Sequence, residues 1–126
     1  MGMTQSSTPH FNLENRTLVF AKNIRAFFKL IPRTIANIED GKQIIRSSGS
    51  VGANYIEANE SLGKRDFMMK VKISKKEAKE SGYWLQLLDI GDNKILENER
   101  MALLQESKEL MLIFGAMLRN AQQKVS

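Results

Sequence analysis

The chain has 126 residues, a mass of 14.3 kDa and no cysteine. Its length fits one domain, since single domains cluster at about 100–150 residues, and the lack of cysteine excludes disulfides, thiolate metal sites and cysteine nucleophiles. The formal net charge is +5 and the isoelectric point is about 9.6, which favours anionic partners, nucleic acid first. No apolar run reaches the roughly 18–20 residues of a membrane-spanning helix, so we expect a cytoplasmic protein with no membrane role.

The first eleven residues are rich in Ser and Thr and show no periodicity. We therefore expect a disordered tail at 1–11 and one domain at 12–126. Asn12 is the predicted N-cap of a helix over 13–31 that Pro32 ends, and residues 33–40 are expected to form a connector or a short helical turn. The apolar stripe of this helix alternates spacings of four and three: Leu13, Thr17, Phe20, Ile24, Phe27 and Ile31.

A second helix is predicted over 41–62, with Gly63 as its terminator. Its stripe is Ile44, Ser48, Val51, Tyr55, Ala58 and Leu62. Glycines and serines crowd into 47–53, and each glycine inside a helix costs about 1 kcal/mol relative to alanine. Helix propensity alone therefore favours a loop there. We predict a helix because the apolar period continues without a phase shift, and because small side chains let a neighbouring helix approach closely.

Two further helices are predicted over 65–90 and 96–123, joined by a turn at Gly91, Asp92 and Asn93. The first has its seam at Phe67, Val71, Ser74, Ala78, Ser81, Leu85 and Leu88. The second has its seam at Leu96, Leu103, Ser107, Leu110, Phe114, Met117 and Ala121. Short connections imply antiparallel neighbours, so the predicted fold is an all-α, up-down-up-down four-helix bundle.

Motifs for catalysis and cofactor binding are lacking. The chain has no phosphate-binding loop of the Walker type, and its single histidine, His10, rules out metal and catalytic motifs that need two. We therefore expect no enzyme, no cofactor and no metal. Carboxylates on or beside the stripes leave a metal or acid–base site as the minor interpretation, but we favour a structural polar network, since buried carboxylates need partners. Its predicted members are Arg46, Asn54, Glu57, Glu77, Glu80 and Tyr83.

Basic residues gather on two helices. Lys22, Arg25, Lys29 and Arg33 share a face opposite the apolar stripe of 13–31. A second group lies in the third predicted helix, and its candidate contacts are Lys72, Lys75, Lys76 and Lys79. Such faces can follow a phosphate backbone with salt-dependent affinity, although most lysine-rich helix faces are only solvated. Both interpretations stay open at this point.

Two segments, RSSGSVGANYIEA (46–58) and DFMMKVKISKKEAKESGYWLQLL (66–88), resemble the four-helix bundle proteins often named 23S rRNA intervening-sequence proteins. The matching positions are Arg46, Ser47, Gly52, Ala53, Asn54, Glu57, Ala58, Phe67, Lys76, Glu77, Ala78, Glu80, Tyr83, Trp84 and Leu85. The resemblance implies a bacterial four-helix bundle, commonly a homopentamer. It also points to the related accessory variability proteins of diversity-generating retroelements, which bind nucleic acid and a reverse transcriptase.

Together these features lead us to expect a self-assembling, non-enzymatic bundle that binds the RNA or DNA backbone through its basic faces. The alternative is a protein-interaction or scaffold subunit whose partner is another protein and whose charge serves solubility.

Overall fold

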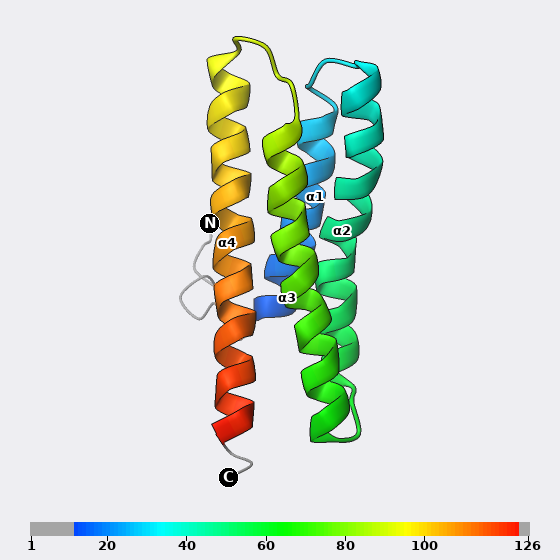
Figure 1. Cartoon of the computed structure of the whole chain (residues 1–126), viewed down its shortest axis with the longest axis vertical. Helices are drawn as coiled ribbons and strands as arrows, with labels where there is room; N and C mark the ends of the chain where they lie inside the picture. Colours follow the sequence, from blue (N-terminus) through cyan, green and yellow to red (C-terminus); the bar gives the residue numbers. More distant parts are fainter. Residues whose placement is uncertain (1–11, 124–126) are drawn as a thin grey trace.

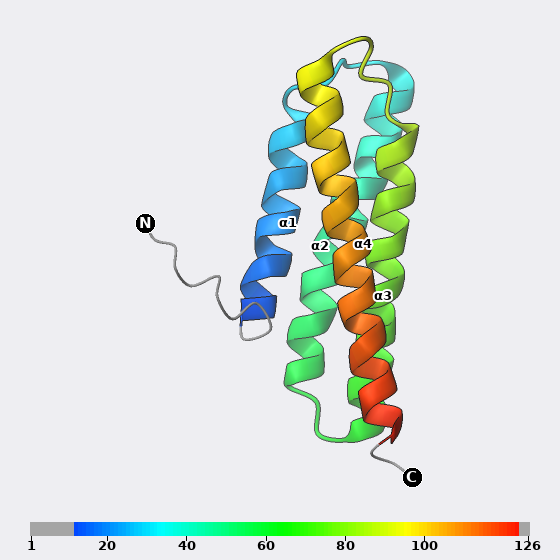
Figure 2. The same cartoon turned by 90° about the vertical axis from the view of Figure 1, so that its left-hand side faces the viewer.

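The computed structural model describes residues 12–123, which form four helices: α1 (Leu13–Phe28), α2 (Ile35–Asn59), α3 (Lys64–Leu87) and α4 (Lys94–Gln123). Successive helices run in opposite directions (Figure 1). α1 packs against α2 and α4, and α3 packs against the same two helices, so α1 and α3 occupy opposite corners (Figure 2). The predicted all-α four-helix bundle is confirmed. The predicted tail at 1–11 lies outside the described residues.

The core follows the predicted stripes closely. All six stripe residues of the first helix are buried, including the hydroxyl-bearing Thr17, which is 1% exposed. The stripes of α2, α3 and α4 are also buried over most of their lengths. Phe67, Met117 and Ala121 are half-buried. Leu62 is fully exposed, because α2 has already ended at Asn59.

For 33–40 the connector is wrong from Ile35 onward and the helical alternative is right, because α2 begins at Ile35 and not at residue 41. Thr34 caps the helix, its side-chain oxygen accepting a 3.1 Å hydrogen bond from the Asn37 N–H. Such a cap satisfies one of the free N–H groups of the first turn. The first turns of α2 expose Ile35 and Ile38, so they carry no apolar stripe from which the helix could be predicted.

Two other boundaries also differ from the prediction. α1 ends at Phe28, before Pro32, and the N–H groups of Lys29 and Leu30 bond to carbonyls three residues back. Pro32 has no N–H to donate to the Phe28 carbonyl, and in a helix its ring would clash with that carbonyl, which favours an end at this point. Gly63, expected to terminate the second helix, is instead the N-cap of α3, in an extended conformation.

The segment 47–53 is helical, so the loop interpretation is wrong. Its small residues lie where other helices come close. A Cβ placed on Gly52 would lie 2.6 Å from Thr17 Oγ1, so the missing side chain lets α1 approach α2. Close packing along two helices offsets the poor helix propensity of this stretch. None of the described helices is both long and apolar enough to cross a membrane.

Candidate nucleic-acid interface

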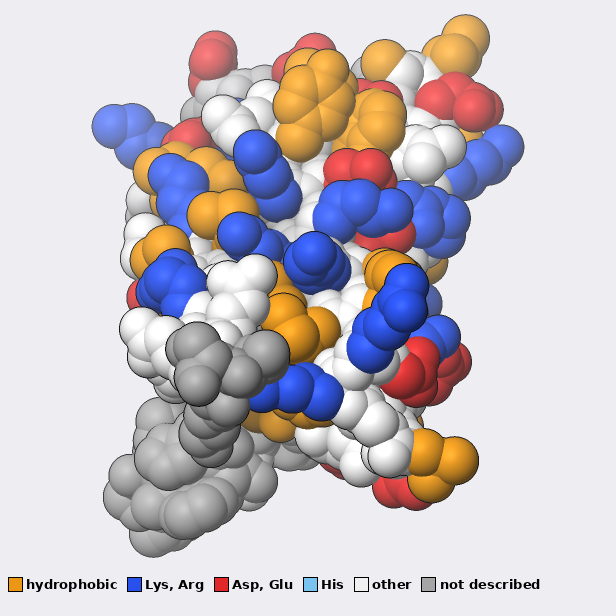
Figure 3. Space-filling view, turned by 60° about the horizontal axis from the view of Figure 1, so that its bottom comes forward, with side chains coloured by type: hydrophobic (Ala, Val, Ile, Leu, Met, Phe, Trp, Pro, Cys, Tyr) orange, Lys and Arg blue, Asp and Glu red, His pale blue; other side chains and the backbone are white. Residues whose placement is uncertain are grey.

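The four candidate lysines of α3, Lys72, Lys75, Lys76 and Lys79, are all exposed. Lys76 lies 4.0 Å from the Glu77 carboxylate. The other three form no salt bridge to any carboxylate of residues 12–123, so their charge is not neutralised locally. Figure 3 shows Lys and Arg side chains gathered on the face of the molecule to which α3 belongs. The sequence prediction of a basic α3 surface thus corresponds to an accessible cationic face.

Helix α4 adds two cations that the sequence interpretation missed. A Cβ on Gly115 would lie 3.8 Å from Lys75 Nζ and 3.5 Å from an Arg119 guanidinium nitrogen, so both side chains pass over this glycine. Lys108 and Lys79 line a shallow groove of about 310 Å³ between α3 and α4. Lys108 and Arg119 are separated by about three helical turns and so share a face of α4. This spacing in the sequence could have indicated that Lys108 and Arg119 belong to one basic face.

We call the resulting surface the α3–α4 basic face and define it as Lys72, Lys75, Lys79, Lys108 and Arg119. None of these five residues forms a salt bridge with a described carboxylate. Exposed cations without local partners are the kind that can neutralise phosphates and release counterions. The face can therefore follow a polyanion.

The α1 set lies elsewhere. Lys22, Arg25, Lys29 and Arg33 are all exposed, and three of them line a groove between α1 and α2. Because α1 and α3 occupy opposite corners of the bundle (Figure 2), the structure does not join the two predicted sets into one surface. A straight nucleic-acid helix lying on the α3–α4 basic face of one chain would leave the α1 set free.

Part of the predicted polar network does come together. Arg46 of α2 donates hydrogen bonds to Glu77 (3.2 Å) and Glu80 (2.9 Å) of α3. The hydrogen bond to Glu77 is the main reason why the pKa of the Arg46 guanidinium is raised. Glu77 is 5% exposed, so this pairing gives a buried carboxylate the cation that it needs.

The other predicted network members lie apart from Arg46. Asn54 bonds within its own helix to Ser50. Glu57 pairs with Lys70 at 2.7 Å, and this hydrogen bond raises the pKa of the lysine. Tyr83 is exposed, with its ring edge-on to Trp84 at 5.2 Å between centroids. The network is thus three residues and not six.

Serines bond the helices where large side chains are missing. Ser47 and Ser81 lie 2.8 Å apart between α2 and α3, and the Ser74 hydroxyl donates to the Val51 carbonyl at 2.9 Å. All three are fully buried. Ser74 and Ser81 occupy seam positions of α3, so the polar interruptions of that seam are contacts to α2.

The carboxylates considered for metal binding are held by cations. Glu77 and Glu80 share Arg46, and Glu57 contacts Lys70. Within residues 12–123, no three His, Asp or Glu side chains are grouped so that they could hold a metal ion.

Fold and surface together define a basic four-helix bundle with small-residue helix contacts and two separate cationic sets. The chain belongs to the 23S rRNA-intervening sequence protein family, whose model matches residues 11–115. It is similar to a crystal structure of a protein of unknown function from the S23 ribosomal protein family of Bacteroides thetaiotaomicron VPI-5482. That likeness has 30% sequence identity and a TM-score of 0.70, and covers 83% of this chain and 96% of the other. No curated protein matches.

Proposed function

We propose that the protein binds the RNA or DNA backbone through its α3–α4 basic face, without sequence specificity. One observation supports this most directly: five exposed cations from two helices share a surface and pair with no described carboxylate. Long-range attraction to phosphates does not need a cleft, and it accounts for most non-specific nucleic-acid binding. The net charge of +5 acts in the same direction.

Binding to fluorescent structured RNA and to duplex DNA, followed by anisotropy at low and near-physiological salt, tests the proposal. The wild-type protein should bind both with a steep negative dependence on salt. The variant K72Q/K75Q/K79Q should bind at least tenfold more weakly at low salt and lose roughly two units of the slope of log K against log[salt], since each phosphate contact contributes about 0.7–0.9.

A matched control is K22Q/K29Q/R33Q, which removes the same number of charges at the opposite corner. It should lower affinity much less than the α3 variant, through net charge alone. Equal losses in both variants would mean that net charge and not the α3–α4 basic face governs binding. Failure of the wild-type protein to bind either nucleic acid at low salt would contradict the proposal.

We also propose that the chain assembles with itself, as the sequence resemblance to a pentameric family implies. The end of the bundle that carries the α1–α2 and α3–α4 connections (Figure 1) supports a contact between copies. Leu30, Ile35, Leu87 and Ile95 flank these connections and are 49–84% exposed, and exposed apolar groups of this size favour association. Light scattering on the eluting protein should give five times 14.3 kDa; a mass of one chain would contradict assembly.

A further inference from the structure

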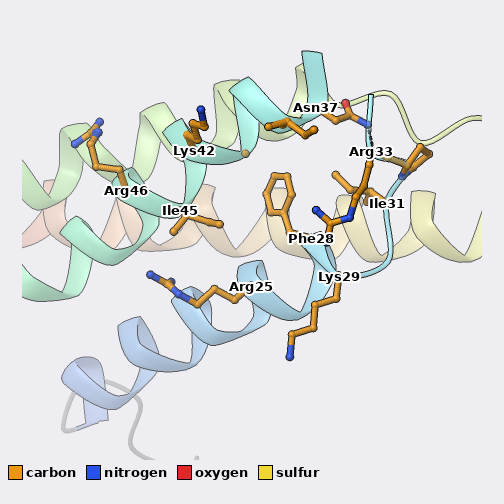
Figure 4. Close-up of a pocket in the computed structure, with 12 residues that line it drawn as sticks. Arg25, Phe28, Lys29, Ile31, Arg33, Asn37, Lys42, Ile45 and Arg46 are labelled. Atoms are coloured by element: carbon orange, nitrogen blue, oxygen red, sulfur yellow. Dashed lines mark hydrogen bonds between the residues drawn. The ribbon is translucent and has the colours of Figure 1, made fainter. Parts of the chain in front are cut away.

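A groove of about 590 Å³ runs between α1 and α2, on the side of the bundle where the α1 cations lie (Figure 4). Its floor is apolar and consists mainly of Phe28, Ile38 and Ile45. Gly41 helps to form that floor: a Cβ there would lie 2.8 Å from Phe28 Cε1, so the phenyl ring reaches α2 only because residue 41 has no side chain. The groove therefore depends both on the glycine at position 41 and on the packing of α1 against α2.

The rim of the groove is cationic on both sides. α1 and the residues that follow it contribute Arg25, Lys29 and Arg33, while α2 contributes Lys42 and Arg46. Lys42 pairs with Glu39 at 3.3 Å and Arg46 with Glu77 and Glu80, so these two charges are partly neutralised. The three from the α1 side form no salt bridge with a described carboxylate, and no Asp or Glu lines the groove.

The length of the groove suits a short helical occupant. On α2 the lining residues recur in pairs every four residues, from Asn37 and Ile38 to Ile45 and Arg46. At 1.5 Å per residue this distance is about 14 Å, or two and a half helical turns. An amphipathic helix places apolar anchors at the same intervals, and acidic residues beside those anchors would meet the cationic rim.

A nucleic acid fits this groove less well. Phosphates would meet the rim but leave the carbon floor without a partner. Phe28 could offer a stacking platform only with a free ring face, but its ring lies against Gly41 and edge-on to Phe27, at 6.3 Å and 75°. Single-strand binders instead present accessible aromatic faces to the bases.

We propose that the α1–α2 groove docks an acidic amphipathic helix of a partner protein. The apolar floor receives the anchors of that helix, and Arg25, Lys29 and Arg33 contact its carboxylates. This surface is separate from the α3–α4 basic face, so one chain can hold the acidic helix and a nucleic acid at the same time.

The test uses the full chain and fluorescein-labelled synthetic peptides of about 18 residues, long enough to form a helix when bound. The probe peptide carries Leu at i, i+3, i+4 and i+7 with Glu on the flanks. A second peptide has the same composition in a non-amphipathic order, and a third has Lys in place of Glu. By anisotropy at low salt, only the first should bind.

Two groove variants and one control then locate the binding site. R25E/K29E removes rim charge and should weaken peptide binding about tenfold, because several rim charges act together. Ile38→Ser removes a floor residue that is 43% exposed, so it leaves the fold intact, and it should weaken peptide binding about fivefold without changing RNA binding. K72E/K75E/K79E should leave peptide binding within about twofold while reducing RNA binding.

Four results would overturn the docking proposal. The first is that the acidic amphipathic peptide does not bind, and the second is that neither groove variant weakens its binding. The third is that the groove variants lose as much RNA affinity as the α3 variant. The fourth is that the groove variants change the oligomeric mass. The third would make the groove a nucleic-acid site, and the fourth would make a second copy its occupant. Unchanged RNA binding in K72E/K75E/K79E would contradict the proposed function alone, so the two proposals fail separately.

Discussion

The side-chain amide of Asn37 forms a pair of hydrogen bonds with the backbone of Asp89. Its Nδ2 donates to the Asp89 carbonyl at 2.8 Å, and its Oδ1 accepts from the Asp89 N–H at 3.0 Å. The same amide nitrogen also donates to the Pro32 carbonyl at 2.9 Å. Asn37 is 2% exposed. One side chain thus ties the α1–α2 connection to the α3–α4 connection, 52 residues away along the chain.

Asn37→Ala should destabilise the protein by about 2 kcal/mol, because it removes three hydrogen bonds between a buried side-chain amide and the backbone of Pro32 and Asp89. Urea unfolding followed by circular dichroism measures the loss. The control is Asn23→Ala on the exposed face of α1, which should change stability by less than about 0.5 kcal/mol. Equal effects of the two substitutions would show that the Asn37 hydrogen bonds contribute nothing specific.

Gly52→Ala and Gly49→Ala should change stability in opposite directions, although both replace a glycine inside α2. A Cβ at 52 would lie 2.6 Å from Thr17 Oγ1 and 3.1 Å from Thr17 Cβ, and this β-branched side chain cannot easily yield. We expect a loss of about 1–3 kcal/mol. A Cβ at 49 meets only Arg25 at 3.8 Å, so the gain in helix propensity, up to about 1 kcal/mol, should prevail. A stabilising Gly52→Ala would show that α1 can move away freely.

Arg16→Met should lower stability by about 1 kcal/mol, since it removes an ion pair that links α1 to α4. Arg16 donates two hydrogen bonds to Glu106, at 2.7 and 2.8 Å, and one to Glu109 at 2.7 Å. Lys42→Met is the matched control: its pair with Glu39 is about two-thirds exposed on both sides, so its loss should not be measurable. The urea concentrations at the unfolding midpoints of the two variants, compared with that of the wild-type protein, measure these losses of stability.

Acidification should destabilise the protein partly through Glu109. A hydrogen bond from Gln105, followed by one from Arg16, lowers the pKa of this carboxyl below its ordinary 4.5. The folded protein then binds fewer protons than the unfolded chain, so this stabilisation is present above the unfolded pKa and is lost as the pH falls through the folded one.

The free energy of unfolding, measured between about pH 5 and pH 3, should therefore fall less steeply in R16M/Q105A than in the wild-type protein. The single variants should lie between. Parallel curves for the wild-type protein and the double variant would show that Glu109 titrates alike in the folded and unfolded chains.

The core of α1 could be predicted residue by residue from spacing alone. Leu13 through Ile31 alternate by four and three, and all six stripe residues are buried, because the faces of a helix are fixed by its own geometry. The first turns of α2 could not be predicted in this way. They depend on the Thr34 cap and on Asn37, whose partner Asp89 is distant in sequence.

The candidate site was only partly predictable. Lysine spacing on α3 identified Lys72, Lys75 and Lys79, but the contribution of Lys108 and Arg119 depends on which helix lies beside α3. Likewise, Arg46, Glu77 and Glu80 form contacts, whereas Asn54, Glu57 and Tyr83 lie elsewhere. Two residues on the same helix face need not share a partner on the next helix.

By itself, the sequence determined the number of helices, the face that each one buries and the positive charge of the surface. These properties follow from the helical period and from side-chain chemistry, which act locally. Only the tertiary structure decided that the two basic sets lie at opposite corners and that Phe28 and Gly41 meet to form a groove floor. Which helices become neighbours, and at what rotation, depends on packing between segments that are far apart in the chain.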